Sequence, residues 1–441
     1  MGDIFMSFLT FYCAVLLTLC GVLFTVKSGF YVFKRPGDIV KCTVGKLVKE
    51  KNPDGFKAMS IALGSTIGIG NIVGVASAIC VGGPGAVFWM LLFAFIGMMT
   101  KYAEIYISVK DANDNNRQCG GPMYVMESMF RGPFKRLGAL FAAACCVGSF
   151  FSGNILQSKS VYEFARLGFG LGFLPVTLIT VPLLGIIIFG KDKLYQNFSA
   201  VFVPLMSVFY IIATIGIIIA NINNVPSALL SVITSAFGFK GIAGGFCGSV
   251  LAVALRTGVM RGLFTNEAGL GSAPIAHCSA KVTDPHSQGC WGIVEVFVDT
   301  VVVCMLTALA VLSSDIYRLG LSTEPFTLVC RIFEDTFGRA GLKVLCISAY
   351  CFAFASIVGW SFYGIKSLQY LSDSAAARKI YIIAFLAFVP LSNILSGDII
   401  WLLTDLFNST MLIPNASMLL YAGSRALPKN IGRIKTKKAA A

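Results

Sequence analysis

The chain has 441 residues, of which 56% are hydrophobic and only 13% are charged. Soluble domains carry about 25% charged residues, so this composition excludes an ordinary soluble enzyme and indicates an all-α protein with many membrane spans. The formal net charge is +14, but Lys and Arg gather in alternate loops, which is typical of a membrane topology signal and argues against a nucleic-acid site.

Runs of about 20 apolar residues define the expected membrane spans. We expect about eleven, at 4–26, 57–80, 84–109, 138–162, 171–190, 195–220, 241–260, 291–312, 343–370, 379–396 and 398–424. The first run lacks a basic n-region and a convincing small-residue cleavage site, so we interpret it as a retained helix and not as a signal peptide.

The charges of the loops predict the orientation. If the N-terminus is outside, 28 of the 35 Lys and Arg residues fall on the side that holds the C-terminus. Cytoplasmic loops carry an excess of Lys and Arg. We therefore expect a multi-pass protein of the inner or plasma membrane, with the N-terminus outside and the C-terminus in the cytoplasm.

A glycine-rich stretch, residues 64–76, lies inside the second expected span. Gly64, Gly68, Gly70 and Gly74 surround Asn71, and no charged residue is near. Glycine weakens a helix, and a break at membrane depth leaves backbone groups that need protein, water or a ligand as partners. The stretch therefore favours a ligand-binding break. The alternative is close helix packing through two G-x-x-x-G patterns.

Ten spans remain when the first is set aside, which suits two inverted five-helix repeats. This plan predicts a second interruption within 241–260, a range that also contains several glycines. The expected organisation is an extra N-terminal helix at 1–30, repeats at 57–220 and 241–424, and a basic cytoplasmic tail at 425–441.

Two facing helix breaks predict the kind of ligand that would bind between them. A half-helix that begins inside the membrane presents N–H groups and a partial positive charge, and one that ends there presents carbonyls and a partial negative charge. Together they suit a zwitterion such as a small neutral amino acid. Freed carbonyls and hydroxyls nearby suit an inorganic cation.

Neither a metal site nor a catalytic set is expected from spacing. The fourteen cysteines show no metal or disulfide pattern, and His277 and His286 are nine residues apart in an expected loop. We expect no cofactor. A membrane-embedded enzyme would need catalytic groups gathered at one depth, and a channel would need a repeated or oligomeric filter. Both readings are therefore remote alternatives to a transporter.

Several motifs resemble those of the alanine/glycine:cation symporter family, also called sodium:alanine symporters. They lie at residues 70–76, 101–104, 120–124, 261–274, 296–300, 359–364 and 401–415. The most specific is the run RGLFTNEAGLGSAP at 261–274. The resemblance implies a LeuT-type fold with one additional N-terminal helix, and import of alanine, glycine or both driven by a cation gradient. Another small amino acid, D-alanine and proton coupling stay open.

One departure from the family concerns the coupling ion. The resemblance implies two adjacent hydroxyl residues where this chain has Ala355 and Ser356. This leaves open whether sodium or a proton drives transport. Ser356 is the only candidate side-chain ligand for Na⁺ in this pair.

The expected site residues fall into three groups. Substrate-binding candidates are Gly68, Gly70, Asn71, Gln157, Gly245, Phe246, Val250 and Trp360. Cation-binding candidates are Thr66, Ile67, Ser356 and Asp299. Gating candidates are Arg261 and Glu267, both expected at the cytoplasmic end of their span.

Each of these roles has a structural alternative. Asn71 would instead cap the break, and Gln157 would make an interhelical hydrogen bond. Phe246 and Val250 would be core. Trp360 would be an interfacial anchor. Asp299 shares a helix face with Glu295 and would instead belong to a buried polar network, and Asp405 is weighed in the same way. The expected partners are a small neutral amino acid, an inorganic cation and the lipid bilayer, with no nucleic acid, and the oligomeric state stays open.

Overall fold

A computed structural model describes residues 2–50, 53–115, 117, 119–190, 192–237, 247–279, 284–322, 324–427 and 431. The described part is built of helices and contains no strand. In the first half of the chain the α-helices are α1 Gly2–Lys27, α2 Tyr31–Lys34, α3 Pro36–Cys42, α4 Val44–Glu50, α5 Asp54–Thr66, α6 Val73–Gly82, α7 Gly85–Asp114, α8 Pro122–Met129, α9 Arg136–Gly148, α10 Leu156–Phe169, α11 Phe173–Ile188 and α12 Asp192–Ala220.

The second half adds α13 Val225–Ala236, α14 Cys247–Asn266, α15 Ala273–His277, α16 Pro285–Val296, α17 Met305–Ser313, α18 Asp315–Arg318, α19 Pro325–Leu371, α20 Ala375–Leu391 and α21 Gly397–Ala426. Short 3₁₀ segments are η1 Ile69–Asn71, η2 Gly132–Lys135 and η4 Ile222–Asn224, and π-helical segments are η3 Ser149–Ile155 and η5 Phe297–Cys304. Helix α19 is kinked at Gly338.

Five continuous helical stretches are long and apolar enough to cross a membrane. They are Gly85–Asp114, Gly132–Phe169, Asp192–Ala220, Pro285–Ser313 and Pro325–Leu371, and Phe11–Lys27, Val73–Gly82 and Phe173–Ile188 are shorter apolar helices. These helices confirm the expected all-α polytopic class. The number of eleven spans and the five-plus-five repeat stay predictions.

The outer surface is apolar where a lipid-facing helix would need it to be. On α12 the exposed side chains include Val201, Leu205, Ile212 and Ile219, which recur at helical spacing on one face. Many small and polar residues are buried instead. This pattern matches a protein that is surrounded by hydrocarbon and keeps its polar groups for helix contacts and function.

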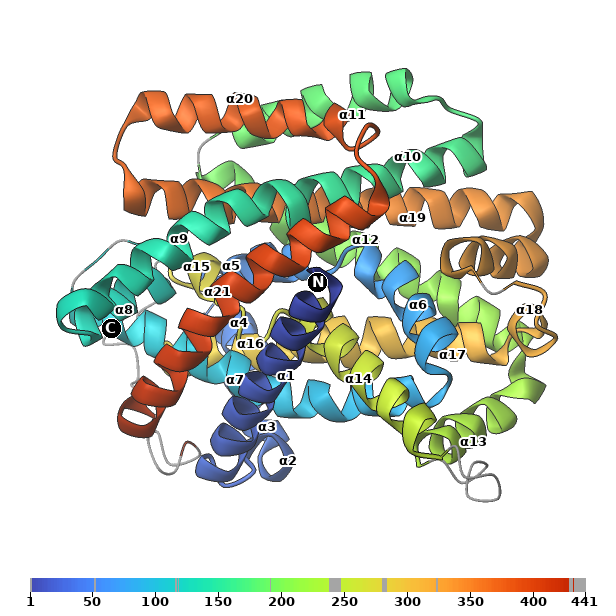
Figure 1. Cartoon of the computed structure of the whole chain (residues 1–441), viewed down its shortest axis with the longest axis horizontal. Helices are drawn as coiled ribbons and strands as arrows, with labels where there is room; N and C mark the ends of the chain where they lie inside the picture. The colour runs from blue at the N-terminus through green and yellow to red at the C-terminus, as the bar shows by residue number, and fades with distance from the viewer. Residues whose placement is uncertain are drawn as a thin grey trace.

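Helix α7 forms the centre of one side of the bundle and packs against α14 and α16. On the other side α19 runs along α9 and α10, and α20 lies farther out beside α11 (Figure 1). The N-terminal helix α1 packs along α21 and α7. The cavity described below lies between these groups of helices.

The second expected span is broken as its glycines predict. Helix α5 ends at Thr66, after which Ile67 and Gly68 are extended, and the chain passes through η1 into α6. The side chain of Asn71 stabilises the break, because its Oδ1 accepts the N–H of Gly68 at 2.9 Å. Glycine packing contributes as well, since a Cβ on Gly64 would lie 2.8 Å from a methyl carbon of Val203. The stretch therefore combines a break with close helix packing at Gly64, and ligand binding at the break stays a prediction.

An interruption lies just beyond the predicted range 241–260, and residues 241–246 of that range lie outside the described residues. Residues 247–260 belong to the continuous helix α14, and the helix unwinds after Asn266, at residues 267–272. Gly248 is therefore helical, while Gly241, Gly244 and Gly245 lie outside the described residues. A run of left-handed residues ends the helix, with φ of 52° at Glu267, 86° at Gly269 and 89° at Gly271.

The close approach of α19 to α5 depends on Gly359. A Cβ at this position would lie 2.6 Å from Cβ of Ser65 and 3.0 Å from its backbone nitrogen. We predict that Gly359→Ala costs about 1–3 kcal/mol through overpacking and lowers the melting temperature of the purified protein. Gly37→Ala is the matched control, because no atom lies within 4 Å of the added methyl group there. Equal melting temperatures for the two variants would contradict this packing argument.

Candidate functional site

A cavity of about 380 Å³ lies at the first break and reaches outward between the helices. Its wall comes from both interrupted helices and from α10, α19 and α21. The residues are Ser65, Thr66, Gly68, Ile69, Gly70, Val73, Gly74, Ser77, Ser152, Leu156, Gln157, Lys159, Ser160, Glu163, Arg261, Thr265, Glu267, Leu270, Glu324, Pro325, Phe326, Ser356, Trp360, Gly397, Ile400, Trp401, Thr404, Asp405 and Asn408.

The first break forms one wall of the cavity. Gly68 and Gly70 line it, as predicted, and so does Gln157 from α10. The side-chain Oε1 of Gln157 accepts the N–H of Ile69 at 3.2 Å, so this amide partners an unwound backbone group while its side chain borders the cavity. The break and the glutamine therefore act as one unit.

Trp360 borders the same space from α19. It packs directly on Gly153 of the π-helical segment η3, where an added Cβ would lie 2.0 Å from the tryptophan Cβ. The Trp360 ring also meets Tyr363, with their centroids 5.9 Å apart. A residue larger than glycine at position 153 would move Trp360, so η3 sets how far the indole reaches into the cavity. Single π-helical turns often occur at functional sites.

The second break forms the facing wall. Thr265, Glu267 and Leu270 line the cavity. Glu267 is a buried residue of the unwound stretch and accepts a hydrogen bond from the hydroxyl of Ser272. The sequence analysis expected Glu267 at the end of its span, but the chain continues past it through α15, so Glu267 lies in the middle of a broken helix.

Arg261 also lines the cavity. Its guanidinium lies 4.9 Å from the ring centroid of Trp401, and one of its nitrogens donates to Ser77 Oγ at 3.5 Å. Asp405 lines the cavity beside them. The expected span ended at residue 260, but α14 continues to Asn266, so Arg261 lies inside the helix, more than one turn before the break.

Asn71, Ile67 and Asp299 do not line the cavity. Asn71 is fully buried, and its Nδ2 donates to Asp299 Oδ1 at 2.8 Å. Thr300 donates to the other carboxylate oxygen of Asp299, also at 2.8 Å. These contacts match the structural alternatives, in which Asn71 caps the break and Asp299 belongs to a buried polar network.

Oxygen atoms gather where α5 ends. Ser356 Oγ of α19 donates to the carbonyl of Ser65 at 2.9 Å, and Thr66 Oγ1 donates to the carbonyl of Leu63 at 3.0 Å. Ser65, Thr66 and Ser356 all line the cavity. A helix C-terminus carries a partial negative charge, so this group suits a small hard cation.

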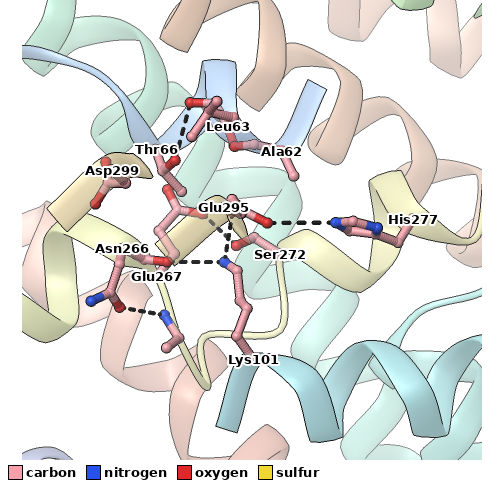
Figure 2. A network of polar contacts seen from close by, with 12 residues as sticks. Ala62, Leu63, Thr66, Lys101, Asn266, Glu267, Ser272, His277, Glu295 and Asp299 are labelled. Atoms are coloured by element: carbon pink, nitrogen blue, oxygen red, sulfur yellow. Dashed lines mark hydrogen bonds and ion pairs between the residues drawn. The ribbon is translucent and has the colours of Figure 1, made fainter. Parts of the chain in front are cut away.

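A cluster of buried charged side chains lies next to the second break (Figure 2). Lys101 Nζ of α7 pairs with Glu295 Oε1 of α16 at 2.9 Å and donates to the carbonyl of Asn266 at 2.9 Å. The ammonium group therefore lies at the negative end of α14. His277 approaches the other oxygen of Glu295 at 3.5 Å. Lys101, Glu295 and His277 are all buried.

Asn415 of α21 ties a further part of the second break in place. Its Nδ2 donates to the carbonyl of Gly269 at 2.8 Å and to Glu104 Oε2 at 3.1 Å. The Asn266 side chain accepts the N–H of Ala268 at 3.0 Å. Backbone groups of the unwound stretch thus find side-chain partners, as membrane depth requires.

Sequence reasoning missed the central role of this buried cluster. It gave Lys101 and Glu104 only as part of a family motif, and it placed His277 in a loop. The available signal was Glu295, a carboxylate within an apolar run one turn before Asp299. A charge in that position needs a buried partner. Of the remaining candidates, Gly245 and Phe246 lie outside the described residues, and Val250 belongs to the part of α14 whose side chains are not described.

Comparisons with known proteins agree with this geometry. The model of the sodium:alanine symporter family matches residues 2–430. The sodium/alanine symporter AgcS of Methanococcus maripaludis is 35% identical over 422 residues, which cover 93% of this chain and 92% of AgcS. The probable sodium/glutamine symporter GlnT of Bacillus subtilis is 34% identical over 406 residues, which cover 91% of this chain and 83% of GlnT.

Solved structures share the fold at low sequence identity. A crystal structure of MhsT in complex with L-phenylalanine aligns with a TM-score of 0.60 and 17% identity, covering 84% of this chain and 89% of MhsT. A substrate-bound, outward-open Na⁺-coupled sialic acid symporter aligns with a TM-score of 0.55 and 15% identity, covering 97% of this chain and 88% of the symporter. These likenesses confirm a LeuT-type transporter fold. With its two interrupted helices around one cavity and a family match over nearly the whole length, the chain belongs to the sodium:alanine symporter family.

Proposed function

We propose that this protein imports small neutral amino acids, alanine or glycine, together with Na⁺ by alternating access. The observation that carries the proposal is that both helix breaks, Ser356 and Trp360 all line one cavity. The name of AgcS, a sodium/alanine symporter, supports alanine and sodium. The name of GlnT, a probable sodium/glutamine symporter, keeps a larger neutral amino acid as the alternative substrate.

The two breaks supply complementary charges for an amino acid. The start of α6 directs N–H groups and a partial positive charge toward the first break, which suits the substrate carboxylate. The Asn266 carbonyl at the end of α14 already accepts from Lys101, so neighbouring carbonyls at this end would take the ammonium group. Gln157 lies beside the first break and would orient the carboxylate. Trp360 would limit the size of the substrate side chain.

The cation would bind where α5 ends against α19. Ser356 Oγ and the carbonyl of Ser65 are already 2.9 Å apart, and Na⁺ would replace the hydrogen bond between them by coordinating both oxygens. Ala355 supplies no side-chain oxygen, so backbone carbonyls or water would complete the coordination. Binding of Na⁺ here would stabilise the same break that holds the substrate, which couples the two.

The structure suits the outward-facing half of such a cycle. The cavity extends to Lys159, Glu163 and Glu324, which belong to segments that the loop charges assign to the outside. On the other side of the second break, the buried Lys101–Glu295 pair and Asn415 join α7, α16 and α21. Opening to the cytoplasm would require these contacts to rearrange. The orientation of the termini, with the N-terminus outside, is part of this proposal.

Purified protein in liposomes is expected to accumulate labelled alanine when an inward Na⁺ gradient is imposed. Separate Na⁺ and proton gradients identify the coupling ion, and unlabelled glycine, D-alanine and glutamine as competitors identify the substrate range. Liposomes without protein provide the background. Uptake that depends on neither gradient would reject symport. Accumulation with a proton gradient alone would show that the coupling ion is the proton and not Na⁺.

Ser356→Ala is expected to raise the Na⁺ concentration for half-maximal alanine uptake about tenfold, or about 1.4 kcal/mol, because one oxygen ligand is lost. Ser356→Thr keeps the hydroxyl and should retain most of the Na⁺ affinity. Ser348→Ala is the matched control, since its hydroxyl lies on the same helix and bonds only to the Val344 carbonyl of that helix among the described contacts. An unchanged Na⁺ dependence in Ser356→Ala would remove this residue from the cation site.

Arg261→Ala is expected to lower the rate of alanine uptake about threefold or more, because the cation–π contact with Trp401 is worth about 0.5–2 kcal/mol and helps to close the outer cavity. Arg256→Ala provides the control, because Arg256 lies on the same helix with an exposed side chain. The amount of folded protein is checked by size exclusion for both variants. Similar uptake rates for the two would show that Arg261 is not part of the outer gate.

A further inference from the structure

We infer that Cys42, His286 and Cys290 form a binding site for one Zn²⁺ ion, separate from the transport cavity. Their ligand atoms, the two Sγ atoms and a ring nitrogen, all lie within 4.8 Å of one another, and all three side chains are buried. None of the three lines the transport cavity. The inference is independent of the substrate and of the coupling ion.

The fold assembles this group from two distant segments. His286 and Cys290 are four residues apart on α16 and so share one face of the helix. Cys42 is the last residue of α3. The hydroxyl of Ser287 donates to the Cys42 carbonyl at 2.7 Å, which fixes the end of α3 against the start of α16. Spacing along the chain predicted no metal site because it did not bring residue 42 beside residues 286 and 290.

The histidine is held in the orientation that a metal ligand needs. Tyr102 Oη lies 2.8 Å from His286 Nδ1, which leaves Nε2 directed to the thiols, 4.0 Å from Cys290 Sγ. A hydrogen bond to one ring nitrogen commonly fixes the other nitrogen for metal binding. Tyr31 Oη is 3.9 Å from Cys290 Sγ, on a further side of the group. These aromatic partners enclose the three candidate ligands.

The donor set fits Zn²⁺. Zinc in proteins is bound by Cys and His in tetrahedral sites, including sites with two Cys, one His and a fourth, exchangeable ligand. Bonds of about 2.0–2.3 Å place neighbouring ligand atoms roughly 3.5–3.8 Å apart, so these side chains need to contract only slightly. Binding converts both thiols to thiolates and releases two protons, and water or Tyr31 completes the coordination. The two thiolates neutralise the charge of the ion, which suits a buried site.

A disulfide between Cys42 and Cys290 is the other chemistry that two neighbouring thiols allow. Its formation removes two electrons and two protons and therefore needs an oxidant, which nothing in the structure supplies. It also gives no role to the orientation of His286. The metal site accounts for all three side chains and for Tyr102.

The test uses the full-length protein, purified in detergent with a reductant, exposed to ZnCl₂ and then desalted. Elemental analysis should find about one zinc per chain in the unmodified protein. Cys42→Ser, Cys290→Ser and His286→Gln should each lose it, and Tyr102→Phe should bind zinc about 10–100-fold more weakly in a chelator competition. Cys278→Ser is the matched control, because Cys278 is also buried near the start of α16 and belongs to no such group in the described part of the chain.

A measurement on the unmodified protein keeps the inference testable if a variant fails to fold. Co²⁺ in place of Zn²⁺ should give the near-ultraviolet thiolate-to-cobalt absorption and the visible bands of a tetrahedral site, and added Zn²⁺ should abolish them. No zinc in the unmodified protein, zinc that survives in all three ligand variants, or octahedral cobalt spectra would each overturn the site. A Cys42–Cys290 disulfide in protein purified without reductant, together with no zinc, would overturn it in favour of redox chemistry.

Discussion

Backbone groups that leave a helix inside a membrane must find partners within the protein, and this requirement organises the whole molecule. At the first break Asn71 and Gln157 accept the N–H groups of Gly68 and Ile69. At the second break Lys101 and Asn415 donate to the carbonyls of Asn266 and Gly269. In water these groups would be solvated, but in hydrocarbon each unpaired group costs several kcal/mol. The binding cavity can exist only because these side chains stabilise its walls.

The donors at the second break are themselves buried, so they in turn need counter-charges. Lys101 pairs with Glu295, which His277 also approaches, and Glu104 accepts from Asn415. Loss of one partner from a buried pair typically costs about 3–5 kcal/mol, because it leaves an uncompensated charge. The same contacts link α7, α16 and α21, which would need to separate for the opposite face to open. The stability of this side of the bundle and the shape of the cavity thus depend on one set of residues.

Local sequence signals predicted the features that depend on neighbouring residues. The composition gave the helical membrane class, and the glycines around Asn71 located the first break, because glycine acts on the conformation of its own backbone. The described break after α14 lies beyond the range 241–260, which followed from the repeat plan and its glycines. Left-handed residues end this helix, and these are Glu267, Gly269 and Gly271.

Contacts between segments that are far apart in the chain could not be predicted from the sequence. Nothing near Cys42 indicates that α3 ends against α16, and nothing near Lys101 indicates that it meets the end of α14. Asn71 was expected at the cavity because of its place in the break. Whether an amide faces inward or caps the chain is decided by the neighbouring helix, here by Asp299 on η5.

The contact between Gly153 and Trp360 bears on how relatives of one fold come to accept different cargo. Position 153 lies against Trp360 and does not border the cavity, yet an added side chain there would clash with Trp360 and displace it. A change of one residue in this hidden spot would therefore alter the room left for a substrate without altering a single atom that the substrate touches. The selectivity of such a carrier can change through residues that lie behind the cavity wall, while the residues of the wall stay the same.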